Sequence, residues 1–367
     1  MNENQIRAIA FYLPQFHPIP ENDEWWGKGF TEWTNVTKAR PLFRGHNQPH
    51  LPADLGFYDL RLGETREAQA ALARQYGIHG FCYYHYWFNG RRILERPVNE
   101  IIASGKPDFP FCLCWANENW TRRWDGEDDE VLLRQNYSPE DDVAHIQALA
   151  RYLNDPRYIR VDGKPLLLIY RVANLPDPAG TVSRWRSEIK RMGLPGLYLC
   201  NVENVPRDRV SRSAGFDAAV EFAPDCTAVP PPQRRSIPWR LARKLRLAPR
   251  LFKEHYITDY EEFMRRMLGK APVDYLLFHG LTPSWDNSAR RKKGAQIFLG
   301  ATPELYGQWL REIVRRTQVR PPEQRIIFIN AWNEWAEGNH LEPCQRLGRA
   351  YLEETARALG CLPPQKP

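Results

Sequence analysis

Several features that would assign a protein to a particular class are missing from this 367-residue sequence. No uninterrupted apolar run is long enough to span a membrane, and residues 1–5 contain no apolar secretion signal. No glycine-rich phosphate loop follows the first expected strand, which argues against a nucleotide-binding Rossmann domain. No Asp-x-Asp metal motif is present, because residues 128–129 and 141–142 are adjacent aspartate pairs. We therefore expect a cytoplasmic protein without a nucleotide-binding fold.

Cysteine is scarce and is placed as a core residue. There are seven cysteines, and Cys82, Cys112 and Cys114 lie inside apolar, strand-like runs, which favours reduced core thiols over a disulfide framework. Cys112 and Cys114 alternate along one expected strand and lack the spacing of metal ligands. The sequence also has neither a Ser-His-Asp order nor a nucleophile elbow. We expect no metal and no cofactor.

Positive charge exceeds negative charge by seven, and much of the excess lies in residues 234–253. No nucleic-acid-binding motif accompanies it, so nucleic acid is not an expected partner. Leucines interleaved with Arg234 to Lys253 indicate an amphipathic helix, for which packing on the protein surface is favoured over docking to a membrane.

Aromatic residues are abundant, with 13 Trp, 16 Tyr and 16 Phe, and many of the tryptophans stand beside Asn, Glu or Asp. Aromatic faces next to hydrogen-bonding side chains suit sugars, whose C–H faces stack while their hydroxyls form hydrogen bonds. This pattern favours a carbohydrate ligand.

Eight short apolar runs, most of them separated by a segment with helical periodicity, predict a parallel α/β fold. The number of strands favours a closed (β/α)8 TIM barrel over an open sheet. We expect one domain over residues 1–367, with a basic, partly helical insertion at 224–274 between the sixth and seventh strands. The expected strands are 6–12, 79–85, 109–115, 166–170, 197–201, 218–222, 275–279 and 326–330.

Helices are expected between most of these strands. Ser138 is a predicted N-cap followed by Pro139 at the first helical position. A long aromatic loop is expected over 15–33, and such loops are uncommon unless they bind something. The expected helices are 64–76, 97–104, 139–153, 182–192, 259–268 and 303–316.

Active sites of such barrels form at the carboxyl ends of the strands, and the residues there are rich in Trp, Tyr, Asn, His and Glu. We expect these side chains to contact a sugar, although for Trp33 packing in the core is an equally favoured role. The expected substrate-binding residues are Tyr12, His17, Trp33, Tyr84, His85, Trp87, Trp115, Asn117, Glu118, Trp120, Asn201, Glu203, Glu221, Trp285, Asn333 and Trp335.

Two carboxylates, Glu334 and Glu337, follow the eighth strand among tryptophans. Aromatic walls raise the pKa of one carboxyl while a polar neighbour keeps another ionised, as glycosidic-bond cleavage requires. The alternative is a pair of solvent-facing glutamates in the first turn of a helix. Asn-Glu also follows the third strand, so Glu118 competes with Glu334. For Glu118 we favour a bond to a substrate hydroxyl or a salt bridge to Arg122 or Arg123.

The residues around Glu334 resemble the catalytic segment of a known enzyme family. Residues 332–338 (Trp-Asn-Glu-Trp-Ala-Glu-Gly) and 342–343 (Glu-Pro) look like the Asn-Glu-Trp-x-Glu-Gly segment of glycoside hydrolase family 99, whose members are endo-acting α-mannosidases and mannanases on (β/α)8 barrels. Outside 224–274 the chain more closely resembles the bacterial family-99-like proteins called the WbsX family, which are associated with O-antigen and other surface-polysaccharide loci. The stretches that carry this second resemblance are 11–18, 25–33, 80–87 and 115–120.

The resemblance implies a retaining glycoside hydrolase without a direct enzyme nucleophile. Glu334 would act as base on the substrate 2-hydroxyl, which attacks C1 to give a 1,2-anhydro sugar. Glu337 would protonate the leaving oxygen and then activate water. Residues 13–17 depart from family 99 in a region that lines the donor-sugar pocket, so mannose is not fixed as the sugar. The expected substrate is an α-linked oligo- or polysaccharide, either mannose-like or an O-antigen.

Two other classes of function stay open. A glycosyltransferase in surface-polysaccharide assembly is suggested by the loci in which such proteins occur. A carbohydrate-binding barrel without activity is disfavoured by the presence of both Glu334 and Glu337.

Overall fold

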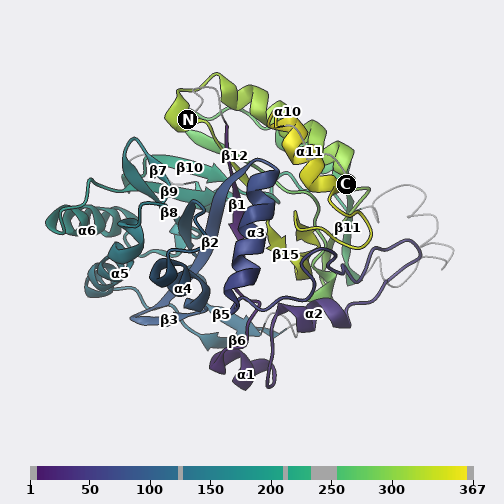
Figure 1. Cartoon of the computed structure of the whole chain (residues 1–367), viewed down its shortest axis with the longest axis horizontal. Coiled ribbons are helices and arrows are strands. Elements are labelled where there is room, and N and C mark those ends of the chain that lie inside the picture. Colours follow the sequence, from purple (N-terminus) through teal and green to yellow (C-terminus); the bar gives the residue numbers. More distant parts are fainter. Residues whose placement is uncertain (1–5, 123–126, 210–213, 233–253, 362–367) are drawn as a thin grey trace.

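Eight parallel strands close into a barrel in the computed structural model, which describes residues 6–122, 127–209, 214–232 and 254–361 (Figure 1). The first strand, β1, pairs with both β2 and β14, which closes the ring. The predicted (β/α)8 TIM barrel is therefore confirmed. In order around the ring, the strands are β1 (Arg7–Tyr12), β14 (Ile326–Ile329), β12 (Leu277–Leu281), β10 (Ala218–Glu221), β9 (Tyr198–Glu203), β8 (Lys164–Ile169), β4 (Phe111–Trp115) and β2 (Ile78–Phe88).

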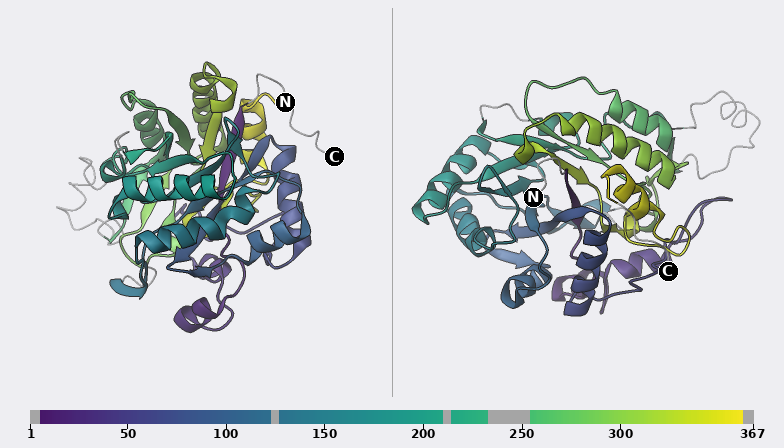
Figure 2. Two further views of the ribbon diagram at one scale, coloured as in Figure 1. Left: turned by 90° about the vertical axis from the view of Figure 1, so that its left-hand side faces the viewer. Right: turned by 45° about the horizontal axis from the view of Figure 1, so that its top comes forward.

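Helices surround the barrel (Figure 2). Those named below lie close to where the sequence predicts them, except α11, for which no helix is predicted. The cap at Ser138 is confirmed, because its hydroxyl oxygen accepts a 3.1 Å hydrogen bond from the Asp141 N–H. The helices are α3 (Gly63–Gln75), α4 (Arg96–Ser104), α5 (Pro139–Leu153), α6 (Pro178–Arg191), α9 (Tyr260–Leu268), α10 (Pro303–Gln318) and α11 (Ala350–Ala358).

The prediction of a long irregular loop over 15–33 is wrong. Two short helices begin there, α1 (Pro20–Trp26) and α2 (Glu32–Lys38). A proline at the first position starts α1, and a capping box between Thr31 and Thr34 starts α2. The dense aromatic composition obscured both signals.

Short strands outside the barrel were not foreseen from the sequence. They form hairpins or small pairings beside the main ring, and β15, which pairs with β16, consists of Asn333 and Glu334. These strands are β3 (Arg91–Ile93), β5 (Trp120–Arg122), β6 (Glu127–Leu133), β7 (Arg160–Val161), β11 (Tyr256–Asp259), β13 (Gln296–Leu299), β15 (Asn333–Glu334) and β16 (Asn339–His340).

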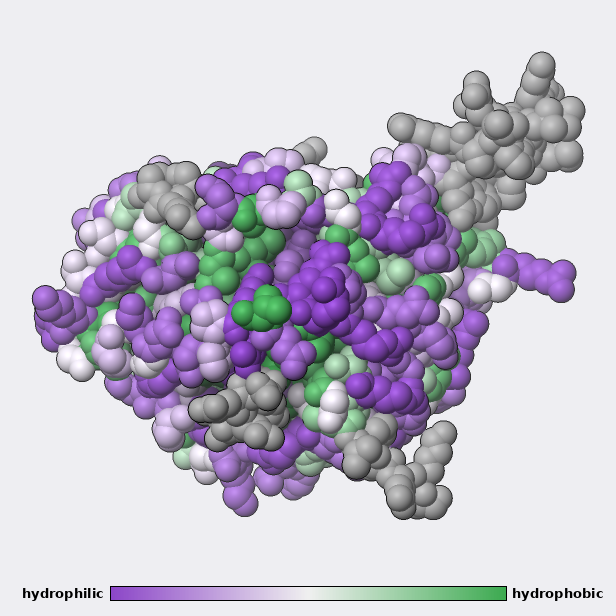
Figure 3. Space-filling model, turned by 90° about the horizontal axis from the view of Figure 1, so that it is seen from above, coloured by the Kyte–Doolittle hydropathy of each residue, from purple (hydrophilic) through white to green (hydrophobic). Residues whose placement is uncertain are grey.

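The expected insertion at 224–274 is described only in part. Its basic stretch, Arg234 to Lys253, lies outside the described residues, so the helix and the surface role predicted for it stay predictions. Among the described helices, none is both long enough and apolar enough to cross a membrane. The face drawn in Figure 3 is mainly hydrophilic, with apolar side chains in small separate groups.

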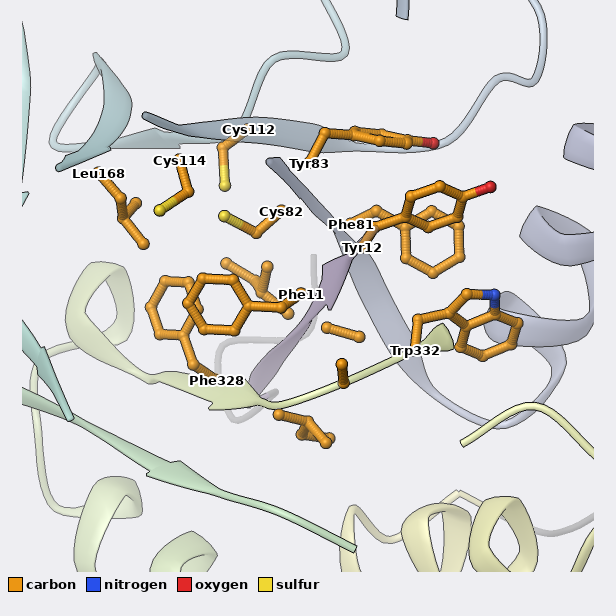
Figure 4. Packing of buried hydrophobic residues seen from close by; sticks show 14 of the residues in the cluster. Phe11, Tyr12, Phe81, Cys82, Tyr83, Cys112, Cys114, Leu168, Phe328 and Trp332 are labelled. Atoms are coloured by element: carbon orange, nitrogen blue, oxygen red, sulfur yellow. The ribbon is translucent and has the colours of Figure 1, made fainter. Parts of the chain in front are cut away.

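Side chains of the barrel strands alternate between the interior and the helical layer. Phe11 points inward, where its ring lies 5.6 Å from that of Phe328 and 5.4 Å from that of Phe222. Tyr12 points outward, and its hydroxyl donates a 2.6 Å hydrogen bond to Oε1 of Gln69 on α3. Figure 4 shows Phe11 and Phe328 together in the core, with Tyr12 on the other side of β1.

The strand cysteines belong to this interior. Cys82, Cys112 and Cys114 are buried free thiols that lie near one another on β2 and β4 (Figure 4). Burial raises the pKa of the Cys82 thiol well above its usual range, so this group stays protonated. The prediction of reduced core thiols is confirmed.

Candidate active site

A cavity of about 460 Å³ opens at the carboxyl ends of the barrel strands. Aromatic rings and charged groups share its wall, as the composition suggested for a sugar site. Six residues singled out from the sequence line it, namely Tyr84, Glu118, Trp120, Trp285, Glu334 and Glu337.

Glu334 and Glu337 are held by a tight loop after β14. Glu334 ends β15, a single turn of 3-10 helix (η8, Trp335–Glu337) follows, and Gly338 turns the chain back with a φ of +57°. A Cβ at Gly338 would lie 3.0 Å from Cβ of Asp286, so both conformation and space favour glycine. The Asp286 N–H donates a 2.6 Å hydrogen bond to the Glu337 carbonyl, which fixes the end of the turn.

Asn333 locks the start of this loop to the neighbouring strand. Its Oδ1 accepts a 2.7 Å hydrogen bond from the Leu13 N–H, and its Nδ2 donates to the Leu13 carbonyl at 3.0 Å. Because the amide is fully buried and forms these bonds, it positions Glu334 and does not line the cavity.

Glu342, three positions beyond Asn339, anchors the far side of the loop. One of its carboxylate oxygens accepts hydrogen bonds from the Tyr58 hydroxyl at 2.8 Å and from Trp335 Nε1 at 2.6 Å, and the other accepts from Gln69 Nε2 at 2.6 Å. Burial nevertheless raises the pKa of Glu342 to about 7. Its surroundings make Glu342 a structural carboxyl beneath the loop.

Arg290 joins the two cavity carboxylates. Its Nη2 lies 2.8 Å from Oε2 of Glu334, and its Nη1 lies 2.6 Å from Oε1 of Glu337. The same guanidinium binds Glu32 of α2 through Nη2 at 3.0 Å and Nε at 3.1 Å. One buried cation therefore meets three carboxylates from two separate parts of the chain.

Burial raises the pKa values of both cavity carboxyls. The pKa of Glu334 rises to about 8, mainly through desolvation, with further increases from the negative charges of Glu337 and Glu32. The pKa of Glu337 is also raised, again mainly by desolvation. Arg290 opposes both shifts, but one positive charge cannot offset three buried carboxylates. Near neutral pH this pair can keep one proton while remaining partly ionised.

Glu118 lies on another part of the cavity wall. Its Oε1 is 3.2 Å from Nε of Arg171, and the arginine also binds the buried Asp208 at 2.8 Å. The partner predicted from the sequence was Arg122 or Arg123. The side chain of Arg122 and the whole of Arg123 lie outside what the structure describes, so a salt bridge to either stays a prediction. Among the described side chains, Arg171, which follows the neighbouring strand β8, contacts Glu118.

The remaining residues expected to bind substrate do not line the cavity. Most are buried side chains that form hydrogen bonds or ring contacts inside the protein, so substrate contact by them stays a prediction that the cavity lining does not support. They are Tyr12, His17, Trp33, His85, Trp87, Trp115, Asn117, Asn201, Glu203, Glu221, Asn333 and Trp335.

Several of these side chains have specific internal partners. His85 Nε2 lies 3.0 Å from His145 Nε2, and Trp87 donates to Asp141 at 3.0 Å. Glu203 accepts a 2.9 Å hydrogen bond from the Tyr275 hydroxyl. Each bond directs its side chain into the packing around the barrel.

The other residues of this group are also engaged within the fold. Glu221 pairs with Lys270 at 2.7 Å, and Asn201 donates to the Asp208 carbonyl at 2.9 Å. The Trp33 indole donates to the Tyr58 carbonyl at 2.8 Å. For Trp33, packing is therefore the role that its contacts support. Burial lowers the pKa of His17 to about 4, so this side chain is neutral.

The sequence reasoning missed Arg290 and assigned no role to Glu32. Arg290 begins the run Arg-Arg-Lys-Lys at 290–293, and a charge run ordinarily indicates a solvated face. Glu32 belongs to the aromatic stretch 25–33, which drew attention for its tryptophans. Only the folded chain brings these two residues to Glu334.

No metal site emerges from the described parts of the chain. Within residues 6–122, 127–209, 214–232 and 254–361, no group of three or more His, Cys, Asp or Glu side chains is arranged to hold a metal ion.

The sequence matches a known family over almost its whole length. The family described as "Glycosyltransferase WbsX" matches residues 8–355. Two curated relatives, both named uncharacterized protein WxcX and from two strains of Xanthomonas campestris pv. campestris, are each 48% identical over 352 residues. These matches cover 96% of this chain and 49% of each relative, so the chain spans about half the length of the curated relatives it matches.

Solved structures share the barrel. A glycoside hydrolase-like protein aligns with a TM-score of 0.61 at 14% identity, over 97% of this chain and 94% of that one. The GH99 endo-α-mannosidase from Bacteroides thetaiotaomicron aligns with a TM-score of 0.56 at 15% identity, over 98% and 97% of the two chains. These likenesses establish a common fold. With the family match over residues 8–355 and relatives at 48% identity, the chain belongs to the Glycosyltransferase WbsX family.

Proposed function

We propose that this chain is a retaining glycoside hydrolase that cleaves an α-linked glycan, with Glu334 and Glu337 as its catalytic residues. The observation that carries the proposal is their convergence: both carboxylates line one cavity and both bind the same guanidinium. Trp120, Trp285 and Tyr84 add aromatic faces to the cavity, and such faces suit sugar rings.

In the proposed reaction, Glu334 takes the proton of the substrate 2-hydroxyl as O2 attacks C1. The bond from C1 to the leaving oxygen breaks, and Glu337 gives its proton to that oxygen, which leaves a 1,2-anhydro sugar. Glu337 then takes a proton from water as the water oxygen attacks C1. The C1–O2 bond breaks, and Glu334 returns its proton to O2. Two displacements at C1 restore the original anomeric configuration.

The raised pKa values support acid–base work by this pair, because the first step needs one ionised and one protonated carboxyl. The raised pKa values fit the acid role of Glu337 better than the base role of Glu334. The rise to about 8 at Glu334 favours a proton on the residue that the family resemblance assigns as the base. The proposal therefore requires that the proton moves to Glu337 when a sugar hydroxyl reaches Glu334.

Hydrolysis of a panel of α-linked mannosides, rhamnosides and purified O-antigen polysaccharides tests the proposal. NMR of the first-formed product should show the retained anomer, and a 2-deoxy analogue of an accepted substrate should stay intact because it lacks O2. An inverted product, or turnover of the 2-deoxy analogue, would contradict this mechanism.

Aryl glycosides with leaving groups of different acidity test the two roles. Loss of the acid should matter less as the leaving group improves, so Glu337→Gln should recover much of its kcat/KM on the most acidic phenols. Its kcat should stay low, because the attack of water also uses Glu337. Glu334→Gln should not recover, because every substrate needs the base at O2. Recovery by Glu334→Gln and not by Glu337→Gln would make Glu334 the acid and Glu337 the base. That assignment would agree with the raised pKa of Glu334, which favours its protonated form.

A second candidate function is glycosyl transfer in surface-polysaccharide assembly, which the name of the matched family favours. Incubation of an acceptor glycan with and without nucleotide- or lipid-linked donors separates the two candidates. Release of free sugar without a donor supports the hydrolase. A product that forms only with an activated donor, and that is longer than the acceptor, supports the transferase.

A further inference from the structure

We propose that Glu32 and Arg290 form a positioning pair that holds Glu334 and Glu337 together and sets how these two carboxyls share one proton. The inference rests on the proposed function for the meaning of that proton, but the arrangement can be tested on the protein without any substrate. Glu32 and Arg290 would act through the two carboxylates and would not themselves take part in bond cleavage.

Glu32 is built as a fixed support. Its side chain has no exposed surface, and its backbone N–H donates a 3.0 Å hydrogen bond to the Gln15 carbonyl in the segment that follows β1. One carboxylate oxygen accepts from Asn35 Nδ2 at 3.3 Å, and the other binds Arg290 through both Nε and Nη2. A carboxylate held at this depth requires a partner, because burial of an unpaired charge is strongly unfavourable.

Arg290 is oriented by this contact. The bonds from Nε and Nη2 to Glu32 direct the outer edge of the planar guanidinium toward the cavity, where Nη2 meets Glu334 and Nη1 meets Glu337. A lysine in this place could offer only one nitrogen. The fork geometry of arginine therefore suits the joining of two carboxylates at a set separation.

The charges of the pair act on the carboxyls in opposite senses. The positive charge of Arg290 lowers the pKa values of Glu334 and Glu337, whereas the negative charge of Glu32 raises both. Other groups face the pair too. Arg291 lowers the pKa of Glu337, and the phenols of Tyr84 and Tyr86 on β2 and of Tyr170 after β8 stay neutral, because burial raises their pKa values.

Two variants should consequently shift the titration of the same two carboxyls in opposite directions. Glu32→Gln keeps the size of the side chain and removes a negative charge, so both carboxyls should titrate at lower pH. Arg290→Met removes the positive charge, so both should titrate at higher pH. The loss of a neighbouring charge corresponds to a shift of about one pH unit or more. A purely structural role would not produce opposite shifts.

The experiment is a pH titration of the full chain labelled with ¹³C at the glutamate carboxyl carbon and followed by NMR. The signals of Glu334 and Glu337 are assigned by their loss in Glu334→Gln and Glu337→Gln. Glu354→Gln is the matched control, because Glu354 on α11 is also a buried carboxylate paired with an arginine, Arg311, at 3.0 Å. This control should leave both titrations unchanged.

Glu32→Gln decides the outcome even if Arg290→Met fails to fold. A downward shift of both titrations supports the proposal, and an unchanged or upward titration overturns it. Arg290→Lys should fold and keep the charge, but it should lose the simultaneous contact with both carboxyls, so the two titrations should separate further from each other. Titrations in Arg290→Lys that match the parent would contradict the positioning role.

The titration also separates this proposal from the proposed function. The parent protein could show no hydrolysis while the two variants still shift the titrations in opposite directions. That result would support the positioning pair and contradict the proposed hydrolase reaction. If the parent hydrolyses a glycoside, the same variants should move the pH dependence of kcat/KM in the same directions as the titrations. If Glu32→Gln is active and its kcat/KM has the same pH dependence as that of the parent, the positioning role is overturned. The proposed hydrolase function is not affected by that result.

Discussion

The dipeptide Asn-Glu follows two strands of this barrel, and the two copies use their asparagines in the same way. After β14, the Asn333 amide bonds to the N–H and carbonyl of Leu13 at 2.7 and 3.0 Å. After β4, the Asn117 amide bonds to the N–H and carbonyl of Arg171 at 2.7 and 2.8 Å. In each case the asparagine ties its strand end to the adjacent strand end, and the glutamate that follows lines the cavity.

The two glutamates differ in burial and in the charges around them. The Glu334 side chain is 7% exposed and shares Arg290 with two other carboxylates. The Glu118 side chain is 32% exposed and binds Arg171, whose other carboxylate partner is Asp208. Burial, together with the negative charges of Glu337 and Glu32, raises the pKa of Glu334 to about 8, and strongly shifted pKa values are typical of functional sites. The surroundings of each glutamate, not the shared dipeptide, distinguish the catalytic candidate.

The largest difference between the two copies should appear in turnover. On a substrate that the parent hydrolyses, Glu334→Gln and Glu337→Gln should each lower kcat/KM by about 10²–10⁴-fold, the usual contribution of general acid–base catalysis. Glu118→Gln should cost less than about tenfold, as expected for one contact to a sugar hydroxyl. Circular dichroism should show that all three variants fold. Substantial activity in both of the first two variants, with a larger loss in Glu118→Gln, would move the catalytic role to Glu118.

Substitution of the two asparagines should lower stability by similar amounts but should affect turnover differently. Asn333→Ala and Asn117→Ala each remove two bonds to backbone groups, so each should lower the free energy of unfolding by about 1–3 kcal/mol, measured by urea denaturation. Only Asn333→Ala should also lower turnover strongly, because it releases the loop that holds Glu334 and Glu337. Equal losses of turnover in the two variants would indicate that both strand ends serve the reaction.

The barrel could be predicted because its strands are continuous apolar runs such as 326–329. Such runs are typical of strands that are buried on both faces of a parallel sheet. The same property hid the direction of individual side chains. With both faces of a parallel strand buried, nothing in the sequence distinguishes inward Phe11 from outward Tyr12. The sequence therefore predicts Tyr12 in the site, whereas its side chain contacts Gln69 on α3. The motif around Glu334 likewise predicts Asn333 in the site, whereas its amide binds the backbone of Leu13.

The carboxylates could be proposed from their motif, whereas their partners could not. Glu32, Arg290 and Glu334 are far apart along the chain, and none of the local patterns around Arg290 differs from a solvated basic segment. Their contact depends on α2, which was itself missed within the aromatic stretch 15–33. An ion cluster that spans three distant segments is a property of the fold.

The smallest effect expected concerns the pH dependence of stability. Because the pKa of Glu334 is raised to about 8 in the folded protein, the folded state keeps a proton that the unfolded state has lost between about pH 4.3 and pH 8. The contribution of Glu334 to the free energy of unfolding is therefore fully present at low pH, and it declines as the pH rises from about 4.3 to about 8. Glutamine does not titrate, so Glu334→Gln should gain stability relative to the parent between pH 5 and pH 8.

Melting temperatures of the two proteins at pH 5, 6, 7 and 8 measure this gain, which should reach about 2 °C or more. Glu67→Gln, which removes an exposed carboxylate of α3, controls for the loss of one negative charge. The buried histidines impose their own pH dependence, but they are present in both proteins and cancel in the difference. A constant difference across the range would mean that Glu334 is ionised throughout, and that Arg290 outweighs the burial and the neighbouring carboxylates.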